Sequence, residues 1–440
     1  MNTRPNLSWS DLRGARVGVW GLGVEGHANL RRLKALGAAP VLVDDAPSEA
    51  GALRTDKGGF DALRSCDVVV KTPGISRYRS EIQTLEADGI PVAGGLGLWM
   101  QEADRTRVAC ITGTKGKSTT TSIAGHLLQM LGFRCFIGGN LGSPPWDPDA
   151  EQDADFWLIE TSSYQATDLK VAPRVVAVTS LHPDHLNWHR DLNTYYRDKL
   201  SICTLPGAQV TVSNAEDPVV AEHRAQLGPH VRWVPDPSLP GDWVPRLRLL
   251  GHHNAVNALL AQAVLAELGI AEASDAAALA EASEGFVPLA SRLQEIGLVD
   301  GVTFVDDSLS TNVLPTLAAL DAFPDRRVAL IAGGFDRGVD YDSLATGVQR
   351  RRAPLLVLGV PDNGPRIIEA ILAAGSAPFV ETRPAESVEE ATRLGLEWAA
   401  PDGVVLLSPA APSFGRFRDY RERAAAFTAA MHALRKMTGR

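Results

Sequence analysis

The chain has 440 residues, of which 45% are hydrophobic and 22% are charged, and it carries a net charge of −9. This length predicts two or three globular domains of ~100–200 residues each, and the acidic balance argues against nucleic acid as the main partner, because such binding depends on Lys and Arg. No apolar run reaches the ~18 residues of a membrane helix, no apolar signal core follows the first residues, and the four cysteines form no C-x-x-C pair, so we expect a cytoplasmic protein without a membrane partner.

The first segment alternates strands and helices. A strand at 16–20 leads into a glycine turn at 21–26 and a helix at 27–36, and further strands are predicted at 40–43 and 68–71. This β-α-β rhythm predicts a parallel sheet.

The glycine turn has the spacing Gly21-x-Gly23-x-x-Gly26, with Asp44 about 20 residues further along the chain. Taken alone, this pattern indicates an NAD-dependent dehydrogenase. The pattern alone is weak, however, and any ligand with a diphosphate could use the same helix end. Because a second glycine loop follows in the chain, two phosphorylated ligands are favoured over a dehydrogenase cofactor.

The second segment begins with a strand at 108–112, a second glycine loop and a helix at 118–131. Strands follow at 156–159 and 175–179, and the Pro- and Trp-rich stretch 231–245 is predicted to be irregular. An Ala-rich helix is predicted at 271–282.

The second glycine loop reads Gly113-Thr-Lys-Gly116-Lys117-Ser118-Thr119. Backbone N–H groups of such a loop and the following helix end can hold phosphate oxygens. Lys117 would reach the β- and γ-phosphates, and the hydroxyl of Ser118 or Thr119 would bind Mg²⁺. The loop is shorter at its front than the usual phosphate loop, and the alternative is a plain turn between strand and helix.

Two further groups are candidates for metal or phosphate contacts. Glu160 ends a predicted strand, where open α/β sheets place their ligands, and carboxylates suit Mg²⁺. The run His182-Pro-Asp-His185-Leu-Asn-Trp-His189 holds three histidines but lacks the spacing of a defined zinc site. We expect His185 beside a phosphate or a second Mg²⁺, while His182 and His189 could equally have a structural role.

Strands at 303–305, 328–331, 355–358 and 404–407 define a third segment. We therefore predict an α/β protein of three domains: a Rossmann-like N-terminal domain, a P-loop ATPase central domain and a Rossmann-like C-terminal domain. Their predicted limits are 1–105, 106–290 and 291–440.

The order of the motifs over nearly the whole chain resembles the Mur ligase family of bacterial peptidoglycan synthesis, most closely its glutamate-adding, MurD-type branch. The ATP loop of that family resembles residues 113–119, with Lys115 in place of Asn, and its Mg²⁺-binding Glu run resembles Glu160-Thr-Ser-Ser-Tyr-Gln165. Its Asp-His-Leu element resembles residues 184–187. Further matches are residues 214–218, 251–257, 306–312, 333–340 and 407–414.

The resemblance implies an ADP-forming ligase that uses ATP and Mg²⁺ to join glutamate to UDP-N-acetylmuramoyl-L-alanine through an acyl phosphate. It implies roles in cell wall biogenesis, cell shape, cell division and the cell cycle, and a monomer that acts in the cytoplasm.

The resemblance also implies the site residues. The catalytic residues would be Lys117, Glu160, His185 and Lys199. The metal ligands would be Ser118, Glu160, His185 and Lys199, the last as a carbamate. Residues that bind ATP would be Gly113, Thr114, Lys115, Gly116, Lys117, Ser118, Thr119, Asn254, Asn257, Arg292 and Asp307. The UDP-substrate would contact Gly23, Val24, Glu25, Asp44, Asp45, Thr72 and Asn140. Glutamate would contact Thr311, Arg337, Ser413, Phe414 and Tyr420.

The sequence also departs from the family pattern, mostly in the C-terminal domain that selects the amino acid. Leu309 replaces a frequent Lys, Ser291-Arg292 replaces His-Arg, residues 94–98 lack the usual acidic residues, and Arg423-Ala424 replaces Arg-Gly. These departures favour the branch that adds L-glutamate, with D-glutamate as the alternative. More remote alternatives are a ligase for another amino acid, a folate-type polyglutamate ligase, a dehydrogenase and a P-loop NTPase.

Overall fold

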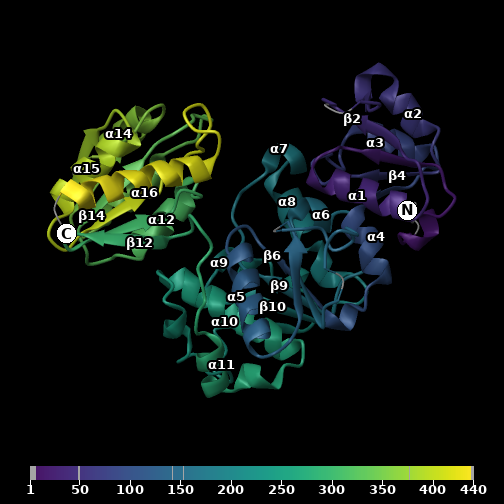
Figure 1. Cartoon of the computed structure of the whole chain (residues 1–440), viewed down its shortest axis with the longest axis horizontal. Coiled ribbons are helices and arrows are strands. Elements are labelled where there is room, and N and C mark those ends of the chain that lie inside the picture. The colour runs from purple at the N-terminus through teal and green to yellow at the C-terminus, as the bar shows by residue number, and fades with distance from the viewer. Residues whose placement is uncertain (1–5, 48–49, 141, 152, 376, 438–440) are drawn as a thin grey trace. The chain divides into compact units, whose positions relative to one another are not determined.

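The computed structural model describes residues 6–47, 50–140, 142–151, 153–375 and 377–437 (Figure 1). The chain forms two compact units, Met1–Leu247 with Val256–Phe286 and Arg248–Ala255 with Val287–Arg440. The first unit holds two parallel sheets and the second holds one mixed sheet. Each of the three predicted segments contains one of these sheets, and the domain limits at 105 and 290 stay predictions.

The N-terminal sheet has the order β3-β2-β1-β4-β5, and all its pairs are parallel. Its strands are β1 Val17–Trp20, β2 Val41–Asp44, β3 Leu53–Arg54, β4 Val68–Lys71 and β5 Val92–Gly94. The helices around it are α1 Val24–Ala35, α2 Phe60–Arg64, α3 Ser80–Ala87 and α4 Gly95–Glu102.

Helix α1 begins within the glycine turn rather than after it, which corrects the predicted start at His27. The reason is close packing, because a Cβ at Gly26 would collide with the carbonyl oxygen of Gly21. The glycines therefore let the helix start directly at the end of β1.

The central sheet has the order β11-β10-β9-β6-β8-β7 and is parallel throughout. Its strands are β6 Val108–Thr112, β7 Cys135–Gly139, β8 Phe156–Glu160, β9 Val175–Val178, β10 Val210–Asn214 and β11 Val231–Val234. Its helices are α5 Lys117–Met130, α6 Ser163–Ala166, α7 Leu186–His189, α8 Leu192–Leu200, α9 Pro218–Glu222, α10 His252–Glu267 and α11 Ala276–Ala282.

Two predictions for this segment were wrong in detail. The stretch predicted to be irregular starts with the edge strand β11, whose hydrogen bonds come from β10, a partner about 20 residues away in sequence. The predicted Ala-rich helix is split, because Asp275 caps a new helix start by accepting from the N–H groups of Ala277 and Ala278.

The C-terminal sheet has the order β12-β13-β17-β14-β15-β16. Its strands are β12 Gln294–Val299, β13 Val302–Asp306, β14 Val328–Ala332, β15 Leu355–Gly359, β16 Val380–Pro384 and β17 Val404–Leu407. Only the β12–β13 pair is antiparallel among the described strands, and the sequence had not indicated this edge strand.

Helices cover both faces of the C-terminal sheet, as expected for buried parallel strands. One core packs the sheet against α12 Val313–Asp321, α13 Asp342–Gln349 and α14 Gly364–Ala373. The opposite core packs it against α15 Val388–Ala399 and α16 Tyr420–Met437, the long yellow helix of Figure 1.

In each of the two fully parallel sheets, the order in which the chain adds strands changes direction at one strand, β1 in the first sheet and β6 in the second. Strands β2 and β3 lie on one side of β1 while β4 and β5 lie on the other, and β8 and β7 lie opposite β9 relative to β6. Ligands of open α/β sheets bind beyond the carboxyl end of the strands at such reversal points. Both glycine loops follow these two strands directly.

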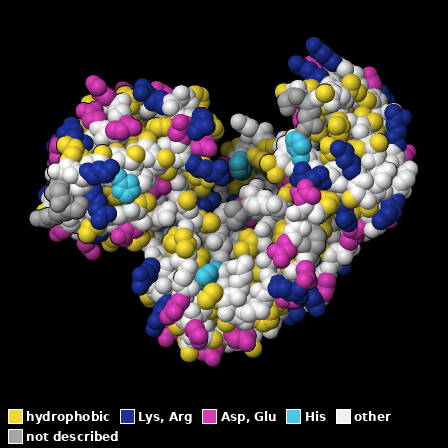
Figure 2. All heavy atoms as spheres, viewed as in Figure 1, with side chains coloured by type: hydrophobic (Ala, Val, Ile, Leu, Met, Phe, Trp, Pro, Cys, Tyr) yellow, Lys and Arg dark blue, Asp and Glu magenta, His cyan; other side chains and the backbone are white. Residues whose placement is uncertain are grey.

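The surface mixes charges of both signs, and on the face seen in Figure 2 Lys and Arg lie interspersed with Asp and Glu. Among the helices in the described ranges, none has both the length and the apolar character required to span a bilayer.

Candidate active site

The loop between β6 and α5 has a backbone that requires glycine at two positions. Gly113 and Gly116 have φ values of 132° and 91°, in the region that side chains disfavour. A Cβ at Gly113 would also collide with Thr179, and one at Gly116 would meet the Asn257 side chain. These conformations turn the loop tightly into the N-terminus of α5.

The loop is held from one side by the segment that follows β9. The N–H of Thr114 donates to the Ser180 carbonyl oxygen at 2.7 Å, and the N–H of Lys115 donates to the Ser180 hydroxyl at 2.9 Å. The other side of the loop remains partly accessible, because Lys115 is exposed and Gly116 and Lys117 are half-buried. The loop is therefore preformed and can still receive a ligand.

Lys117 folds back over this loop. Its Nζ donates to the carbonyl oxygens of Gly113 at 3.0 Å and Thr114 at 3.1 Å. Ser118 is buried in the first turn of α5, and Thr119 is half-buried next to it. A lysine and a hydroxyl at the start of a helix are the groups that a phosphate chain and its metal ion need.

Glu160 is the last residue of β8, the neighbour of β6, and its side chain is 2% exposed. Its Oε1 accepts a hydrogen bond from Asn140 Nδ2 at 2.6 Å. Its Oε2 is buried and has no hydrogen-bond partner among the residues that the structure describes. Because an unpaired buried carboxylate oxygen is costly, this atom fits a cation such as Mg²⁺.

Lys199 lies beneath the loop on α8 and is 2% exposed. Its Nζ donates to the Gly113 carbonyl oxygen at 2.9 Å and lies 5.0 Å from the centre of the Tyr195 ring. Burial, and then the charge of Lys117, hold the pKa of Lys199 well below its ordinary value of 10.5, while Glu160 opposes the shift. The structure thus brings Lys199 into electrostatic contact with two other predicted catalytic residues.

His185 stands at the start of α7 with a φ of 53°. Burial lowers the pKa of its half-exposed imidazole, Asp184 opposes this shift, and the Lys199 amine adds to it. The ring also packs edge-on against Tyr164 at 5.0 Å. A neutral imidazole with this low pKa can offer a lone pair to a metal or a hydrogen bond to a phosphate.

Within the described ranges, no three His, Cys, Asp or Glu side chains are grouped closely enough to hold a metal by themselves. Mg²⁺ in nucleotide sites typically takes only one or two carboxylates, with phosphates and waters completing the shell. Glu160 with its unpaired oxygen, Ser118 and His185 fit that role.

The remaining predicted ATP contacts lie in different surroundings. Asn257 packs on Gly116 and its Oδ1 accepts from Thr120 Oγ1 at 3.4 Å. Asn254 donates to the Leu250 carbonyl oxygen at 2.8 Å. Arg292 lies between Ser291 and Leu293, which both have positive φ values.

Asp307 is buried and holds the loop that carries Arg292. Its carboxylate accepts from the Leu293 N–H at 3.1 Å and from the Ser408 hydroxyl at 2.7 Å. Burial raises the pKa of Asp307 to about 7. Its contacts in this structure support the loop, and a direct contact with ATP stays a prediction.

In the N-terminal sheet, the glycine turn packs on Thr72, since a Cβ at Gly21 would collide with the Thr72 side chain. Gly23, the N-cap of α1, has open space around it, and Val24 is 73% exposed. The start of α1 is therefore accessible to a ligand with a diphosphate.

Asp44 has a different role from the one that the dehydrogenase pattern predicts. Its Oδ2 accepts from the Leu22 N–H at 2.7 Å and its Oδ1 from the Ala46 N–H at 2.8 Å. Both oxygens thus brace the glycine turn and the loop after β2 instead of standing ready for a ribose hydroxyl.

Asp45 follows β2, and Glu25 lies in the first turn of α1. Asp45 accepts from Thr55 Oγ1 and from Arg79 Nη1, and it lines a depression of about 500 Å³ with Arg54 and Phe60. Glu25 accepts from Gln165 Nε2 at 2.7 Å, and burial raises its pKa to about 7.

In the second unit, a cavity of about 220 Å³ opens at the carboxyl ends of β14 and β15. Of the five residues predicted to bind glutamate, Ser413 and Phe414 line it. Arg337 is exposed and donates to the Thr311 carbonyl oxygen at 3.3 Å. Tyr420 starts α16, where its carbonyl oxygen accepts from Ser308.

Sequence reasoning missed the buried cation of this cavity. Arg423 is 1% exposed, lines the cavity, and donates to Ser308 and to the Ala411 carbonyl oxygen. Burial lowers its pKa to about 10, so it stays charged at neutral pH. The sequence did offer a signal, the Arg423-Ala424 pair in place of Arg-Gly. Arg423 was noted there as a departure from the family pattern and was not assigned to the glutamate site.

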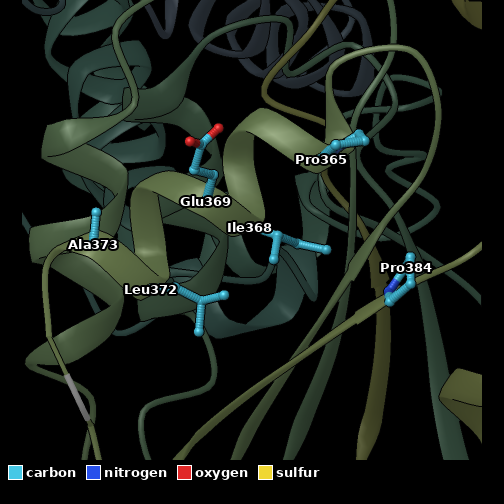
Figure 3. Close-up of a pocket in the computed structure, with 6 residues that line it drawn as sticks. All are labelled: Pro365, Ile368, Glu369, Leu372, Ala373 and Pro384. Atoms are coloured by element: carbon cyan, nitrogen blue, oxygen red, sulfur yellow. The ribbon is translucent and has the colours of Figure 1, made fainter.

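A larger depression of about 570 Å³ lies along α14 and β16 and shares no lining residue with that cavity. Figure 3 shows Ile368 and Leu372 projecting from α14, with Pro384 on the neighbouring strand. Among the described residues that line it, only Glu369 is charged. Because glutamate carries two carboxylates, this apolar depression does not suit it.

The motifs and the geometry agree with comparisons to known proteins. Residues 111–234 match the Mur ligase middle domain, and residues 291–411 match the Mur ligase glutamate ligase domain. The chain is 41% identical to a UDP-N-acetylmuramoyl-L-alanine--L-glutamate ligase of Micromonospora sp., over 96% of this chain and 97% of that protein. It is 39% identical to a protein of the same name from Xanthomonas euvesicatoria, over 94% of each chain.

Solved structures show the same fold at low identity. MurC, the UDP-N-acetylmuramate-alanine ligase of Thermotoga maritima, is 19% identical with a TM-score of 0.56, over 95% of this chain and 99% of that one. MurF of Acinetobacter baumannii is 17% identical with a TM-score of 0.57, over 97% and 92%. Together with the full-length relatives, these matches confirm the predicted fold class, and the chain belongs to the Mur ligase family.

Proposed function

We propose that this chain is an ATP-dependent, ADP-forming ligase that joins L-glutamate to UDP-N-acetylmuramoyl-L-alanine in peptidoglycan synthesis. The observation that carries the proposal is the convergence of Lys117, Lys199 and Glu160, with its unpaired oxygen, around the loop after β6. The full-length relatives that are named as L-glutamate ligases support the choice of amino acid.

The reaction has two chemical steps. The carboxylate of the L-alanyl group attacks the γ-phosphorus of ATP, which forms an acyl phosphate and releases ADP. The amine of glutamate then attacks the acyl carbon, so that an amide forms, phosphate leaves and a proton is released. Phosphoryl transfer of this kind depends on positioning and on neutralisation of charge.

The groups around the loop after β6 supply these two effects. The loop N–H groups and Lys117 would hold the phosphates, and Ser118, Glu160 and His185 would hold Mg²⁺, which neutralises charge on the phosphates when it is bound. Asn257 packs on Gly116 of this loop, and its place near the adenine is what the resemblance implies.

Lys199 fits the carbamate that its position implies. Only a neutral amine reacts with CO₂, and the low pKa of Lys199 favours that form. The reaction turns a buried amine into a carboxylate-like anion that is able to bind a cation.

The N-terminal sheet would hold the UDP portion. The open helix start at Gly23, the exposed Val24 and the depression beside Asp45 offer contacts for a diphosphate and a nucleobase. Glu25 and Thr72 border the same turn, and Asn140 contacts Glu160. We place the reaction in the cytoplasm and expect a monomer, as the sequence and the resemblance imply.

The stereochemistry of the amino acid is tested by phosphate release. With UDP-N-acetylmuramoyl-L-alanine and ATP, we expect L-glutamate to stimulate release far more than D-glutamate at equal concentration. Equal or greater stimulation by D-glutamate would reverse the proposed enantiomer but leave the ligase reaction in place. Release that ignores both amino acids would point instead to an NTPase.

Replacement of Arg337 should change the KM for glutamate without changing the KM for ATP. A guanidinium can pair with a carboxylate through two hydrogen bonds, so Arg337→Ala is expected to raise the KM for L-glutamate about 10- to 100-fold. The KM for ATP should stay within twofold. Arg383→Ala, which removes another exposed arginine of the same unit, is the matched control and should change neither constant.

A dehydrogenase is disfavoured by Asp44. Its two carboxylate oxygens are engaged by backbone N–H groups, whereas NAD recognition uses that carboxylate for the ribose. No reduction of NAD by the purified protein is expected.

A further inference from the structure

A buried chain of hydrogen bonds runs behind the loop after β6. Tyr78 Oη donates to the Asp198 carboxylate at 2.7 Å, and His189 Nδ1 lies 2.7 Å from Asp198 Oδ2. His189 Nε2 lies 2.8 Å from Ser163 Oγ. Because a carboxylate accepts, Nδ1 donates to Asp198, while Nε2 and the Ser163 hydroxyl share the second hydrogen bond.

Three members of this chain are buried, while Tyr78 at its end is partly exposed. His189 is 0% exposed, Ser163 is 2% exposed and Asp198 is 7% exposed. The imidazole is packed among rings, with its centre 4.4 Å from Trp188, 5.2 Å from Tyr195 and 5.4 Å from Tyr164. In such a setting both hydrogen bonds are strong. Removing one partner would leave a buried polar group unsatisfied and would lower the stability of this region.

The chain connects the backbone segments that carry three of the four proposed metal ligands, Glu160, His185 and Lys199. Ser163 begins α6, three residues after Glu160. Asp198 directly precedes Lys199 on α8. His189 ends α7, the helix that follows His185.

The ring of His189 is the only link between Ser163 and Asp198 that the described hydrogen bonds provide. One imidazole bonds a hydroxyl on one side and a carboxylate on the other, which ties the two segments together in addition to the direct packing of α6 on α8. Short helices such as α6 and α7, of four residues each, have little stability of their own. Their placement therefore depends on contacts of this kind.

We propose that His189 is a positioning residue, which acts through Ser163 and Asp198 to set the spacing between Glu160 and Lys199 around the metal–nucleotide complex. This inference rests on the proposed function. When a residue that orients a metal ligand is removed, the affinity for the metal usually falls about 10- to 100-fold. The effect should therefore appear in metal binding rather than in nucleotide binding.

The test is a direct titration with Mn²⁺ as a spectroscopic substitute for Mg²⁺. Free Mn²⁺ is measured by electron paramagnetic resonance, with the full-length protein saturated with a non-hydrolysable ATP analogue. In Ser163→Ala and His189→Gln we expect the Kd for Mn²⁺ to rise about 10-fold or more. The Kd for the analogue without metal should stay within twofold of the wild type.

A double-mutant cycle tests whether the residues act as one chain. If they do, Ser163→Ala combined with Asp198→Asn should weaken Mn²⁺ binding by much less than the product of the two single effects. Independent effects that multiply would overturn the proposal. Ser163→Ala removes one hydroxyl, so it keeps the test valid if the larger change at His189 impairs folding.

The matched control is His223→Asn. His223 is another histidine of the central segment, its Nδ1 bonds to the Val219 carbonyl oxygen at 2.8 Å, and its ring packs on Tyr196. This variant should bind Mn²⁺ as the wild type does.

Two outcomes separate the failure of this inference from the failure of the proposed function. If Glu160→Gln loses Mn²⁺ while Ser163→Ala and His189→Gln bind it normally, the metal site stands and the positioning role is overturned. If the wild type binds Mn²⁺ no better than Glu160→Gln, the proposed metal site is wrong and the inference falls with it.

Discussion

Lys117→Ala is expected to lower the kcat for glutamate-dependent phosphate release about 100-fold or more, the scale of losing one preorganised charge-stabilising donor. Lys117 is anchored at the start of α5, and its Nζ already lies over the loop, 3.0 Å from the Gly113 carbonyl oxygen. In phosphoryl transfer negative charge spreads over the moving phosphoryl oxygens, and the lysine of such a loop neutralises part of it. Without the amine that charge remains uncompensated.

The measurement is steady-state phosphate release with UDP-N-acetylmuramoyl-L-alanine, ATP and L-glutamate. Lys34→Ala is the matched control, since Lys34 is an exposed lysine in the last turn of α1 and should leave the rate unchanged. Ligation that keeps most of its rate in Lys117→Ala would show that the loop after β6 does not bind the triphosphate.

The second large effect is expected at Lys199. Lys199→Met should abolish most ligase activity, because it removes both the buried amine and any anion formed on it by CO₂. In wild-type protein, removal of CO₂ and bicarbonate from the buffers should lower the rate, and adding bicarbonate should restore it. A small carboxylate such as acetate, which could occupy the space of the missing carbamate, should partly rescue Lys199→Ala but not Lys117→Ala.

The direction of the pKa shift predicts a pH dependence for the same residue. Since CO₂ reacts with the neutral amine, activity that depends on the carbamate should fall as the pH is lowered and Lys199 takes up a proton. Carbon-13 NMR of protein supplied with labelled bicarbonate would detect the carbamate directly. A rate that is indifferent to bicarbonate at every pH would contradict the carbamate.

Stability measurements separate this loss of activity from unfolding. The folded pKa of Lys199 lies below its ordinary value of 10.5, so the unfolded chain binds a proton that the folded chain does not. Burial of this amine therefore lowers stability progressively as the pH falls from 10.5 to the lower folded pKa, and the loss stays constant below that pKa. In bicarbonate-free buffer, Lys199→Met should have a Tm equal to or higher than that of the wild type, with the larger gain at lower pH.

Local sequence patterns were sufficient for the parts of the fold that depend on near neighbours. Strands such as β4 and β6 were predicted with their observed limits, because short runs of Val and Ile bounded by turn residues have few alternatives. The loop at Gly113–Gly116 was also predictable, since its strand–glycine–helix context lies within one short stretch of chain.

Features that depend on distant partners were not predictable. Strand β11 forms because β10 supplies its backbone hydrogen-bond partners. Strand β12 pairs antiparallel with β13 at the sheet edge. The hydrogen bonds by which the Asp44 carboxylate braces the glycine turn after β1 were not indicated by the sequence, and its contact with the substrate stays a prediction. Each outcome depends on which groups come into hydrogen-bonding distance after folding.

The sequence by itself determined the three α/β segments, the glycine loop between β6 and α5, and the family, because glycine spacing and apolar runs are local properties of the chain. Only the tertiary structure decided that Glu160 keeps one oxygen unpaired, that Lys199 is buried beneath the loop, and that Arg423 lines the C-terminal cavity. Only folding joined Ser163, His189 and Asp198. Burial and charge proximity arise from residues far apart in sequence, and these two quantities set the pKa values and the affinities on which the proposed chemistry depends.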